Sequence, residues 1–180
     1  MRYRRSQTPG ATFFFTVVTY NRKRILSLGD NSFHLRRSIE AVKAEHPFTI
    51  DAIVLLPEHL HCIWTLPQGD NDFSKRWMLI KSKFTRVCDD PFKGTPSSSR
   101  IEKRERNIWQ RRFWEHQIRD EIDYKRHVDY VHYNPVKHGL VKAPIEWKFT
   151  SFHRYVNNGT YHRDWGANLE IVIDTTIGCE

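Results

Sequence analysis

The stretch FTIDAIVLLPEHLHCIWTL, residues 48–66, decides the fold because it predicts two consecutive β-strands joined by a short turn. In the first strand, residues 48–56, apolar side chains recur at every second position and are predicted to share one face: Phe48, Ile50, Ala52, Val54 and Leu56. Pro57-Glu58 interrupts this pattern, and a second strand is predicted over residues 59–66. Side chains alternate across a strand, so its two faces should be His59, His61 and Ile63 against Leu60, Cys62, Trp64 and Leu66.

Strands and helices are predicted on either side of this pair. Residues 12–20 (TFFFTVVTY) are dense in aromatic and β-branched residues and predict a buried strand. Apolar residues spaced by three and four predict helices over residues 31–45 and 72–87. The apolar stripe of the second helix is Phe73, Trp77, Ile80, Phe84 and Val87. Residues 89–106 lack periodicity and are predicted to form a mobile loop.

The remaining elements complete an α+β pattern. Residues 109–118 are predicted to form a strand, and residues 121–134 a helix that Asp120 caps. The resulting order of strand, helix, strand, strand, helix, strand and helix favours an antiparallel sheet covered by helices. We expect a single domain over residues 1–160 and a C-terminal tail over residues 161–180.

Composition narrows the class of protein. The chain has 180 residues, 39% hydrophobic, and a formal net charge of +8, which suits a globular domain with an anionic partner such as nucleic acid. Its three scattered cysteines predict no disulfide framework and suit a reducing cytosol. No apolar run is long enough to span a membrane. We therefore expect a cytoplasmic protein.

His59 and His61 form the first candidate site. Both imidazoles project from one strand face, so they can share one divalent ion, and neutral imidazole is a common metal ligand. The alternative is two ordinary histidines on a solvated strand. A catalytic metal site needs further ligands, and the candidates that spacing leaves open are Glu58, Glu115, His116, Asp129 and Asn134.

The last predicted helix carries a second cluster of polar residues. Tyr130 and Asn134 are four residues apart, and His127 lies three residues before Tyr130, so all three share a face. A separate apolar face, formed by Tyr124, Val128 and Val131, should pack on the sheet. Tyr130 is therefore expected among polar groups, although a half-buried structural tyrosine with a wet hydroxyl is the alternative.

Basic residues interleaved with aromatic residues favour nucleic-acid binding, because cations contact phosphates and rings stack on unpaired bases. The residues expected to contact DNA on this ground are Arg22, Arg24, Lys83, Arg111, Arg112, Trp114 and Lys137. Lys81 and Arg86 carry further charges beside them.

Several of these blocks, in this order, resemble a known family. Leu-Pro-Glu-His-Leu-His (56–61), Trp109-Gln110, Phe-Trp-Glu-His (113–116) and Val-Asp-Tyr (128–130), followed by Asn-Pro-Val-Lys-His-Gly (134–139), are similar to the REP-associated tyrosine transposases. These proteins belong to the HUH superfamily and are relatives of the single-strand insertion-sequence transposases. The similarity runs from about residue 12 to residue 155.

The resemblance implies a ferredoxin-like antiparallel sheet of the HUH endonuclease type. It also implies a DNA-transposing and recombining endonuclease that cuts single-stranded DNA and forms a 5′-phosphotyrosine. Tyr130 would be the nucleophile, with His127 as a possible proton acceptor. His59, His61 and Asn134 would hold Mg²⁺ or Mn²⁺. The absence of a GxxxxGK[ST] loop agrees with a reaction that needs no nucleotide cofactor.

The resemblance also implies a substrate: REP palindromes, which fold as hairpins beside a guide tetranucleotide. The basic arm with Arg2, Arg4 and Arg5 would read that flank. A monomer is expected, with dimers found among related transposases. Two other readings stay open: a non-catalytic module that binds nucleic acid, and a structural zinc domain using His59, His61 and His116, which lacks the paired cysteines typical of such sites.

Overall fold

The computed structural model describes residues 8–103, 105–167 and 177. Its strands are β1 (Thr12–Val18), β2 (Thr49–Leu55), β3 (His59–Thr65) and β4 (Trp114–Gln117). Its helices are α1 (Asn31–Glu45), α2 (Phe73–Val87), α3 (Asp90–Lys93), α4 (Ser98–Glu102), α5 (Glu121–Lys137) and α6 (Phe152–Asn157), with 3-10 turns η1 (Tyr20–Arg22) and η2 (Pro144–Glu146). Arg2, Arg4 and Arg5 lie outside the described residues.

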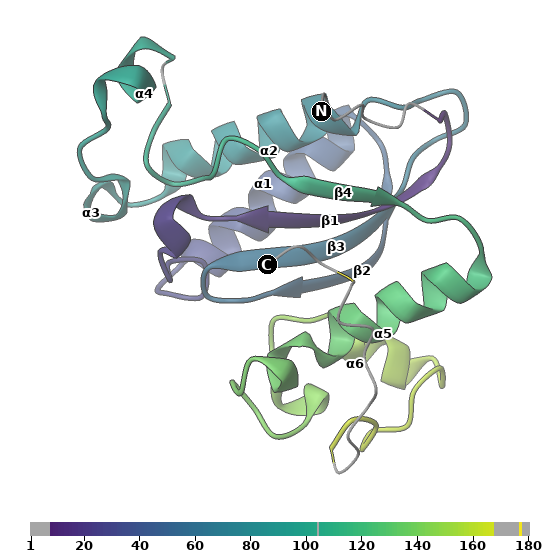
Figure 1. The fold of residues 1–180 in the computed structure, drawn as a ribbon. Coiled ribbons are helices and arrows are strands. Elements are labelled where there is room, and N and C mark those ends of the chain that lie inside the picture. Colours follow the sequence, from purple (N-terminus) through teal and green to yellow (C-terminus); the bar gives the residue numbers. More distant parts are fainter. Residues whose placement is uncertain (1–7, 104, 168–176, 178–180) are drawn as a thin grey trace.

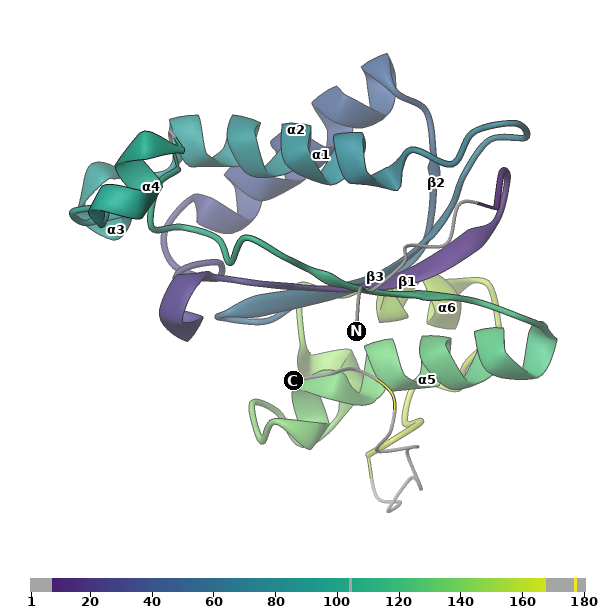
Figure 2. The ribbon, with the colours of Figure 1, turned by 45° about the horizontal axis from the view of Figure 1, so that its top comes forward.

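The four strands form one antiparallel sheet in the order β2-β3-β1-β4. The element order β1-α1-β2-β3-α2-β4 in this strand arrangement is the ferredoxin-like fold. The α+β class and sheet type expected from the sequence are therefore confirmed. Figure 2 shows α1 and α2 on one side of the sheet and α5 and α6 on the other.

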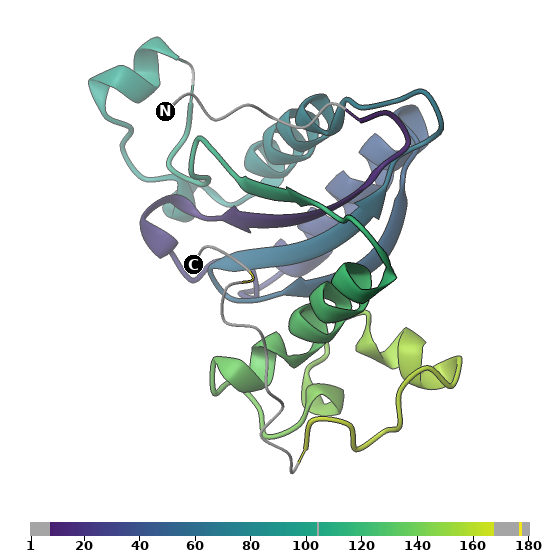
Figure 3. The ribbon, with the colours of Figure 1, turned by 45° about the vertical axis from the view of Figure 1, so that its right-hand side comes forward.

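Two apolar cores lie on the two faces of the sheet. The face toward α1 and α2 carries Phe13, Phe15, Val17, Leu60, Cys62 and Trp64. The face toward α5 carries Phe14, Ala52, Val54 and Ile63, which pack with Val128 and Val131 of α5. His59 and His61 alternate with Leu60 and Cys62, so they belong to the α5 face, as the period of β3 predicts. Figure 3 shows α5 lying across this face.

The prediction that residues 48–56 keep a single apolar face is wrong. The register between β2 and β3 shifts between Ile50 and Ala52. A β-bulge of this kind adds one residue to one strand and reverses the side-chain alternation beyond it. Phe48 and Ile50 consequently pack in the core beneath α1 and α2, whereas Ala52 and Val54 pack beneath α5.

The region between α2 and α5 also differs from expectation. Val87 is 48% exposed, because it is the last residue of α2 and lies outside the stripe that meets the sheet. Residues 89–106 were expected to lack structure but contain α3 and α4. The predicted strand 109–118 shortens to β4 plus one isolated bridge from Trp109 to Thr19. The carbonyl of Gln110 accepts a hydrogen bond from Lys81 Nζ at 2.6 Å.

Helix α5 begins as predicted, where the Asp120 side chain accepts a hydrogen bond from the Asp123 backbone N–H at 2.8 Å. It continues through Pro135 to Lys137, three residues beyond its predicted end. The packed unit also extends past residue 160, since Tyr161 stacks on Phe152 and on Trp165 with ring centroids 5.4 and 4.6 Å apart. None of the helices described is both long and apolar enough to cross a membrane.

Candidate active site

His59 and His61 lie side by side on β3, with ring centroids 4.8 Å apart. Each ring is held through its Nδ1 atom. Glu58 Oε1 lies 3.2 Å from His59 Nδ1, and Thr16 Oγ1 lies 2.9 Å from His61 Nδ1. A histidine ligand whose Nδ1–H donates to an oxygen presents Nε2 to the metal, with its ring orientation fixed. The pair is therefore oriented as a metal site requires.

Thr16 reaches His61 because β1 and β3 pair in a register that sets these two residues opposite each other. Both side chains are buried. No sequence pattern singles out Thr16, because its contact with His61, 45 residues further along the chain, depends on strand pairing. Glu58 appeared there only as one of several candidate ligands.

Asn134 is the group on α5 that could complete the site. Its side chain is fully buried, and within the described residues neither its amide oxygen nor its amide nitrogen has a hydrogen-bond partner. A buried amide left without partners costs about 1–3 kcal/mol of folding free energy. A metal ion coordinated by the amide oxygen would offset part of this cost. Two imidazoles and one amide oxygen form a donor set that divalent ions accept. The residues present thus fit a metal ion.

Tyr130 lies one helical turn before Asn134 and contacts His61 of the histidine pair. Its ring meets that of His61 edge-on, with centroids 5.2 Å apart, and that of Phe14 at 5.9 Å. Tyr130 is fully buried within the apolar cluster beneath α5, so the alternative of a half-buried tyrosine with a wet hydroxyl is wrong. Its polar neighbours are His61 and Lys137. Because the Tyr130 side chain is closed off from solvent, a phosphate can reach its hydroxyl only after neighbouring groups move.

Lys137 approaches the same tyrosine from the end of α5. Its Nζ atom donates a hydrogen bond to the Tyr130 hydroxyl at 3.2 Å and lies 4.8 Å from the ring centroid. His138, the next residue, packs its ring edge-on against His59 at 5.2 Å. The sequence analysis placed Lys137 among DNA contacts and did not connect it with Tyr130.

His127 belongs to a different cluster. Its Nδ1 lies 2.8 Å from the Asp123 backbone oxygen and 3.2 Å from the Asp123 carboxylate. Its ring stacks on His116 at 4.6 Å and packs on Phe14 at 4.9 Å. Burial lowers the pKa of His127, which keeps the ring neutral.

The same cluster could hold a metal ion, since ligand atoms of His116, Asp123 and His127 all lie within 4.8 Å of one another. However, the carboxylate already accepts from His116 Nε2 at 2.9 Å and from Arg119 Nε at 3.2 Å. Although burial raises it, these hydrogen bonds hold the pKa of Asp123 at about 2. The neighbouring Arg119 guanidinium repels a metal cation, so we interpret the cluster as an ion-pair network around Asp123.

The other candidate ligands lie apart from the pair. Glu115 is opposite Phe15 on the sheet and so faces the α1 and α2 side. Asp129 accepts a hydrogen bond from the Tyr161 hydroxyl. His116 is held by Asp123.

The expected DNA contacts are scattered over both sides of the molecule. Arg22 and Arg24 line a small hollow together with Glu58 and His138, next to the histidine pair. Lys83 lies on the other helical layer, 3.2 Å from Glu45. Arg111 pairs with Glu105, and Arg112 is exposed. Trp114 is half-buried on the α5 face, 5.7 Å from Phe14 between ring centroids.

Comparisons with known proteins agree on one family. The chain is 48% identical over 167 residues to the REP-associated tyrosine transposase of Escherichia coli K12, covering 93% of this chain and 92% of that protein. It is 40% identical over 175 residues to a putative REP-associated tyrosine transposase of Haemophilus influenzae Rd, covering 97% and 98%. No protein-family model matches the chain.

A solved structure gives the same answer. A REP-associated tyrosine transposase bound to a REP hairpin superimposes on this chain with a TM-score of 0.78 at 48% identity. The match covers 92% of this chain and 90% of that one.

Proposed function

The chain belongs to the REP-associated tyrosine transposases, and we propose that it cleaves and rejoins single-stranded DNA beside a palindromic REP-type hairpin. A relative at 48% identity is bound to such a hairpin, which supports this substrate. The observation that carries the proposal is the contact between Tyr130 and His61, one helical turn from Asn134, whose buried amide has no partner in the part of the chain that the structure describes. A nucleophile and a candidate metal site therefore adjoin.

In the proposed reaction, the Tyr130 oxygen attacks the scissile phosphorus. The new bond joins this oxygen to phosphorus, and the bond from phosphorus to the 3′ oxygen breaks. The phenol proton passes to solvent, and the departing 3′ oxygen takes a proton from solvent. The product is a 5′-phosphotyrosine and a free 3′-hydroxyl. One phosphodiester replaces another, so attack by a 3′-hydroxyl reverses the step without a nucleotide cofactor.

Lys137 supports this chemistry through its contact with the nucleophile. An ammonium group 3.2 Å from the hydroxyl stabilises negative charge on that oxygen. His127 makes its contacts with Asp123, His116 and Phe14, which favours a structural role over that of proton acceptor.

The metal would be Mg²⁺ or Mn²⁺, held by Nε2 of His59, Nε2 of His61 and the Asn134 amide oxygen. When bound, it supplies positive charge at a non-bridging phosphate oxygen. The orienting contacts from Glu58 and Thr16 support this assignment, as does the Asn134 amide, which lacks a hydrogen-bond partner among residues 8–103, 105–167 and 177.

The test is covalent adduct formation on a labelled hairpin oligonucleotide with a single-stranded flank. The wild-type chain should give a protein–DNA adduct that resists SDS when Mg²⁺ or Mn²⁺ is present. Tyr130→Phe should give none, and EDTA should abolish the adduct while largely sparing hairpin binding. Tyr133→Phe, on the same helix, is the matched control and should behave as the wild type.

Two outcomes would contradict the proposal. An adduct that persists in Tyr130→Phe would assign the nucleophile elsewhere. A wild-type chain that binds the hairpin but forms no adduct with either metal would make the protein a non-catalytic DNA-binding module.

A further inference from the structure

A large groove lies apart from the histidine pair, between α2 and the segments 90–103 and 105–113. Its volume is about 1010 Å³. Because α2 covers the face of the sheet opposite α5, the groove is not part of the metal site. Six cationic side chains and two acidic ones line it: Lys81, Arg86, Lys93, Arg100, Arg106 and Arg111 against Asp90 and Glu105.

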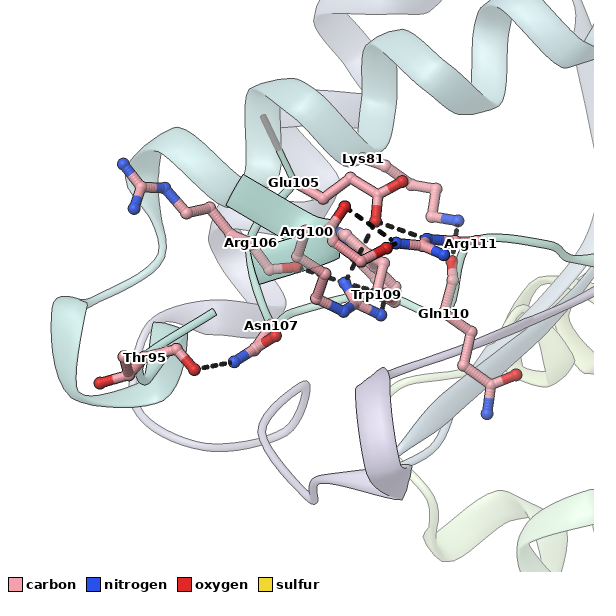
Figure 4. A network of polar contacts seen from close by, with 10 residues as sticks. Lys81, Thr95, Arg100, Glu105, Arg106, Asn107, Trp109, Gln110 and Arg111 are labelled. Atoms are coloured by element: carbon pink, nitrogen blue, oxygen red, sulfur yellow. Dashed lines mark hydrogen bonds and ion pairs between the residues drawn. The ribbon is translucent and has the colours of Figure 1, made fainter. Parts of the chain in front are cut away.

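Both acids are already neutralised by ion pairs. Glu105 accepts a hydrogen bond from Arg111 Nε at 2.7 Å and lies 3.7 Å from Arg100, as Figure 4 shows. Asp90 lies 2.8 Å from Lys93 Nζ. The groove therefore keeps an excess of four positive charges, which favours an anionic ligand.

Arg86 and Arg106 are the charges best placed to meet such a ligand. Both are exposed, and neither forms an ion pair with any residue in the described parts of the chain. Figure 4 shows the Arg106 guanidinium directed away from the network around Glu105. In contrast, the Arg100 guanidinium is buried, 3.9 Å from the centroid of the Tyr20 ring, and holds the groove together.

Residues of η1 line two smaller hollows, one of which adjoins the groove and the other the histidine pair. One of about 440 Å³ shares Arg100, Gln110 and Arg111 with the groove and reaches Tyr20 and Asn21. The next, of about 240 Å³, is lined by Arg22 and Arg24 together with Glu58, which holds His59. Tyr20 and Asn21 of η1 line the first of these hollows, and Arg22 of the same turn lines the second.

The turn η1, which lines both hollows, has an unusual backbone conformation that neighbouring contacts hold in place. Asn21 and Arg22 have φ values of 52° and 49°, a conformation that residues with side chains rarely adopt. Such strain persists only where surrounding contacts enforce it. Here Thr19 Oγ1 lies 2.8 Å from the backbone oxygens of Lys23 and of Glu58 and can donate its hydrogen to either, which ties the turn to the start of β3.

The groove offers charge but little surface for stacking bases. Trp109 is buried at its floor, and Phe113 packs into the core beneath α2. Binding of single strands relies on aromatic rings that face the bases, whereas a duplex presents phosphates on its outside. The groove therefore suits a double-stranded backbone.

We propose that this groove binds the phosphate backbone of the hairpin's duplex stem, and that Arg22 and Arg24 guide the adjoining single strand to His59 and His61. This inference rests on the proposed function and adds where each part of the substrate lies.

The test compares a hairpin that has a single-stranded flank with the same hairpin trimmed to its stem and loop. Affinity is measured by fluorescence anisotropy over a series of salt concentrations. Arg86→Ala/Arg106→Ala should weaken binding of both DNAs and lower the slope of log affinity against log salt by about 1 for each arginine removed. Arg22→Ala/Arg24→Ala should weaken binding of the flanked hairpin alone.

Arg37→Ala/Arg163→Ala is the matched control, because both arginines are exposed, outside the path and not ion-paired within the described residues. It removes the same charge and should leave both affinities and slopes close to wild type. If Arg86→Ala/Arg106→Ala matches this control, the groove does not bind DNA. If it weakens only the flanked hairpin, the groove holds single-stranded DNA and the assignment to the stem is overturned.

Adduct formation by the wild-type chain separates this inference from the proposed function. If the wild-type chain forms the adduct and Arg86→Ala/Arg106→Ala binds the stem as the wild type does, only the inference about the groove is overturned. Weakened stem binding without a wild-type adduct overturns the catalytic proposal alone.

Discussion

Lys137 and Tyr130 lie two turns apart on α5, and the Lys137 ammonium donates a hydrogen bond to the Tyr130 hydroxyl at 3.2 Å. The contact is possible because long side chains on a helix point back toward its N-terminus. It also requires the helix to continue through Pro135, which it does. A fixed positive charge thus meets the oxygen that we propose as the nucleophile.

The first prediction concerns this contact. Lys137→Met should slow adduct formation by about 10- to 100-fold, because hydrogen bonds from charged groups contribute about 1.5–3 kcal/mol. Lys137→Arg should retain more activity, since it keeps the charge. The measurement is the single-turnover rate at saturating DNA. An equal loss of hairpin affinity, with an unchanged rate at saturation, would show that Lys137 acts by binding DNA.

The second prediction concerns the groups behind the histidines. Glu58→Gln and Thr16→Val should each raise the Mn²⁺ concentration needed for half-maximal adduct formation by about 10- to 100-fold, as loss of groups that orient metal ligands commonly does. Glu121→Gln, on the exposed first turn of α5, is the control for charge. An unchanged metal requirement in both variants would remove these two residues from the site.

The third prediction concerns His127. Its Nδ1 is held by Asp123, so His127→Gln should keep adduct formation within about threefold of wild type, well short of the 10²- to 10⁴-fold effect of losing a general base. Thermal unfolding of the same variant would show any structural cost. A loss of 100-fold or more in a variant that is still folded would identify His127 as the proton acceptor.

The fourth prediction concerns acid stability. His132 is buried between α5 and α6, and burial lowers its pKa to about 3. Unfolded chains bind this proton near pH 6.5, so between pH 6.5 and 3 the unfolded state holds more protons and stability falls as pH falls. The expected contribution is on the order of 2 kcal/mol lost between pH 6.5 and 5.

Urea unfolding at pH 7.5 and 5 measures this dependence. His132→Gln should be less stable at pH 7.5 but should show a smaller loss on acidification. His162→Ala removes an exposed histidine and should lose as much stability between pH 7.5 and 5 as the wild type does. If the stability of His132→Gln falls with pH as much as that of the wild type, groups other than His132 cause the acid sensitivity.

The sequence and the structure contributed different parts of this description. Local periodicity was enough to place His59 and His61 on one face of β3, and to set Tyr130 and Asn134 one turn apart on α5, because both relations depend only on strand and helix geometry. The order of strands and helices also predicted the α+β class. None of these inferences needed contacts between distant segments.

Other features depend on how distant segments meet, and only the tertiary structure decided them. The bulge near Asp51 changes the face on which half of β2 packs, and the alternation of Phe48–Leu56 carries no sign of it. Thr16 reaches His61 through strand register, and Lys81, Arg86 and Arg106 share one groove through the docking of residues 89–113 on α2. Tyr130 is buried because the packing of α5 on the sheet places its ring against Phe14 and His61. Sequence fixes local geometry, whereas burial and partnership follow from long-range packing, which a one-dimensional pattern does not encode.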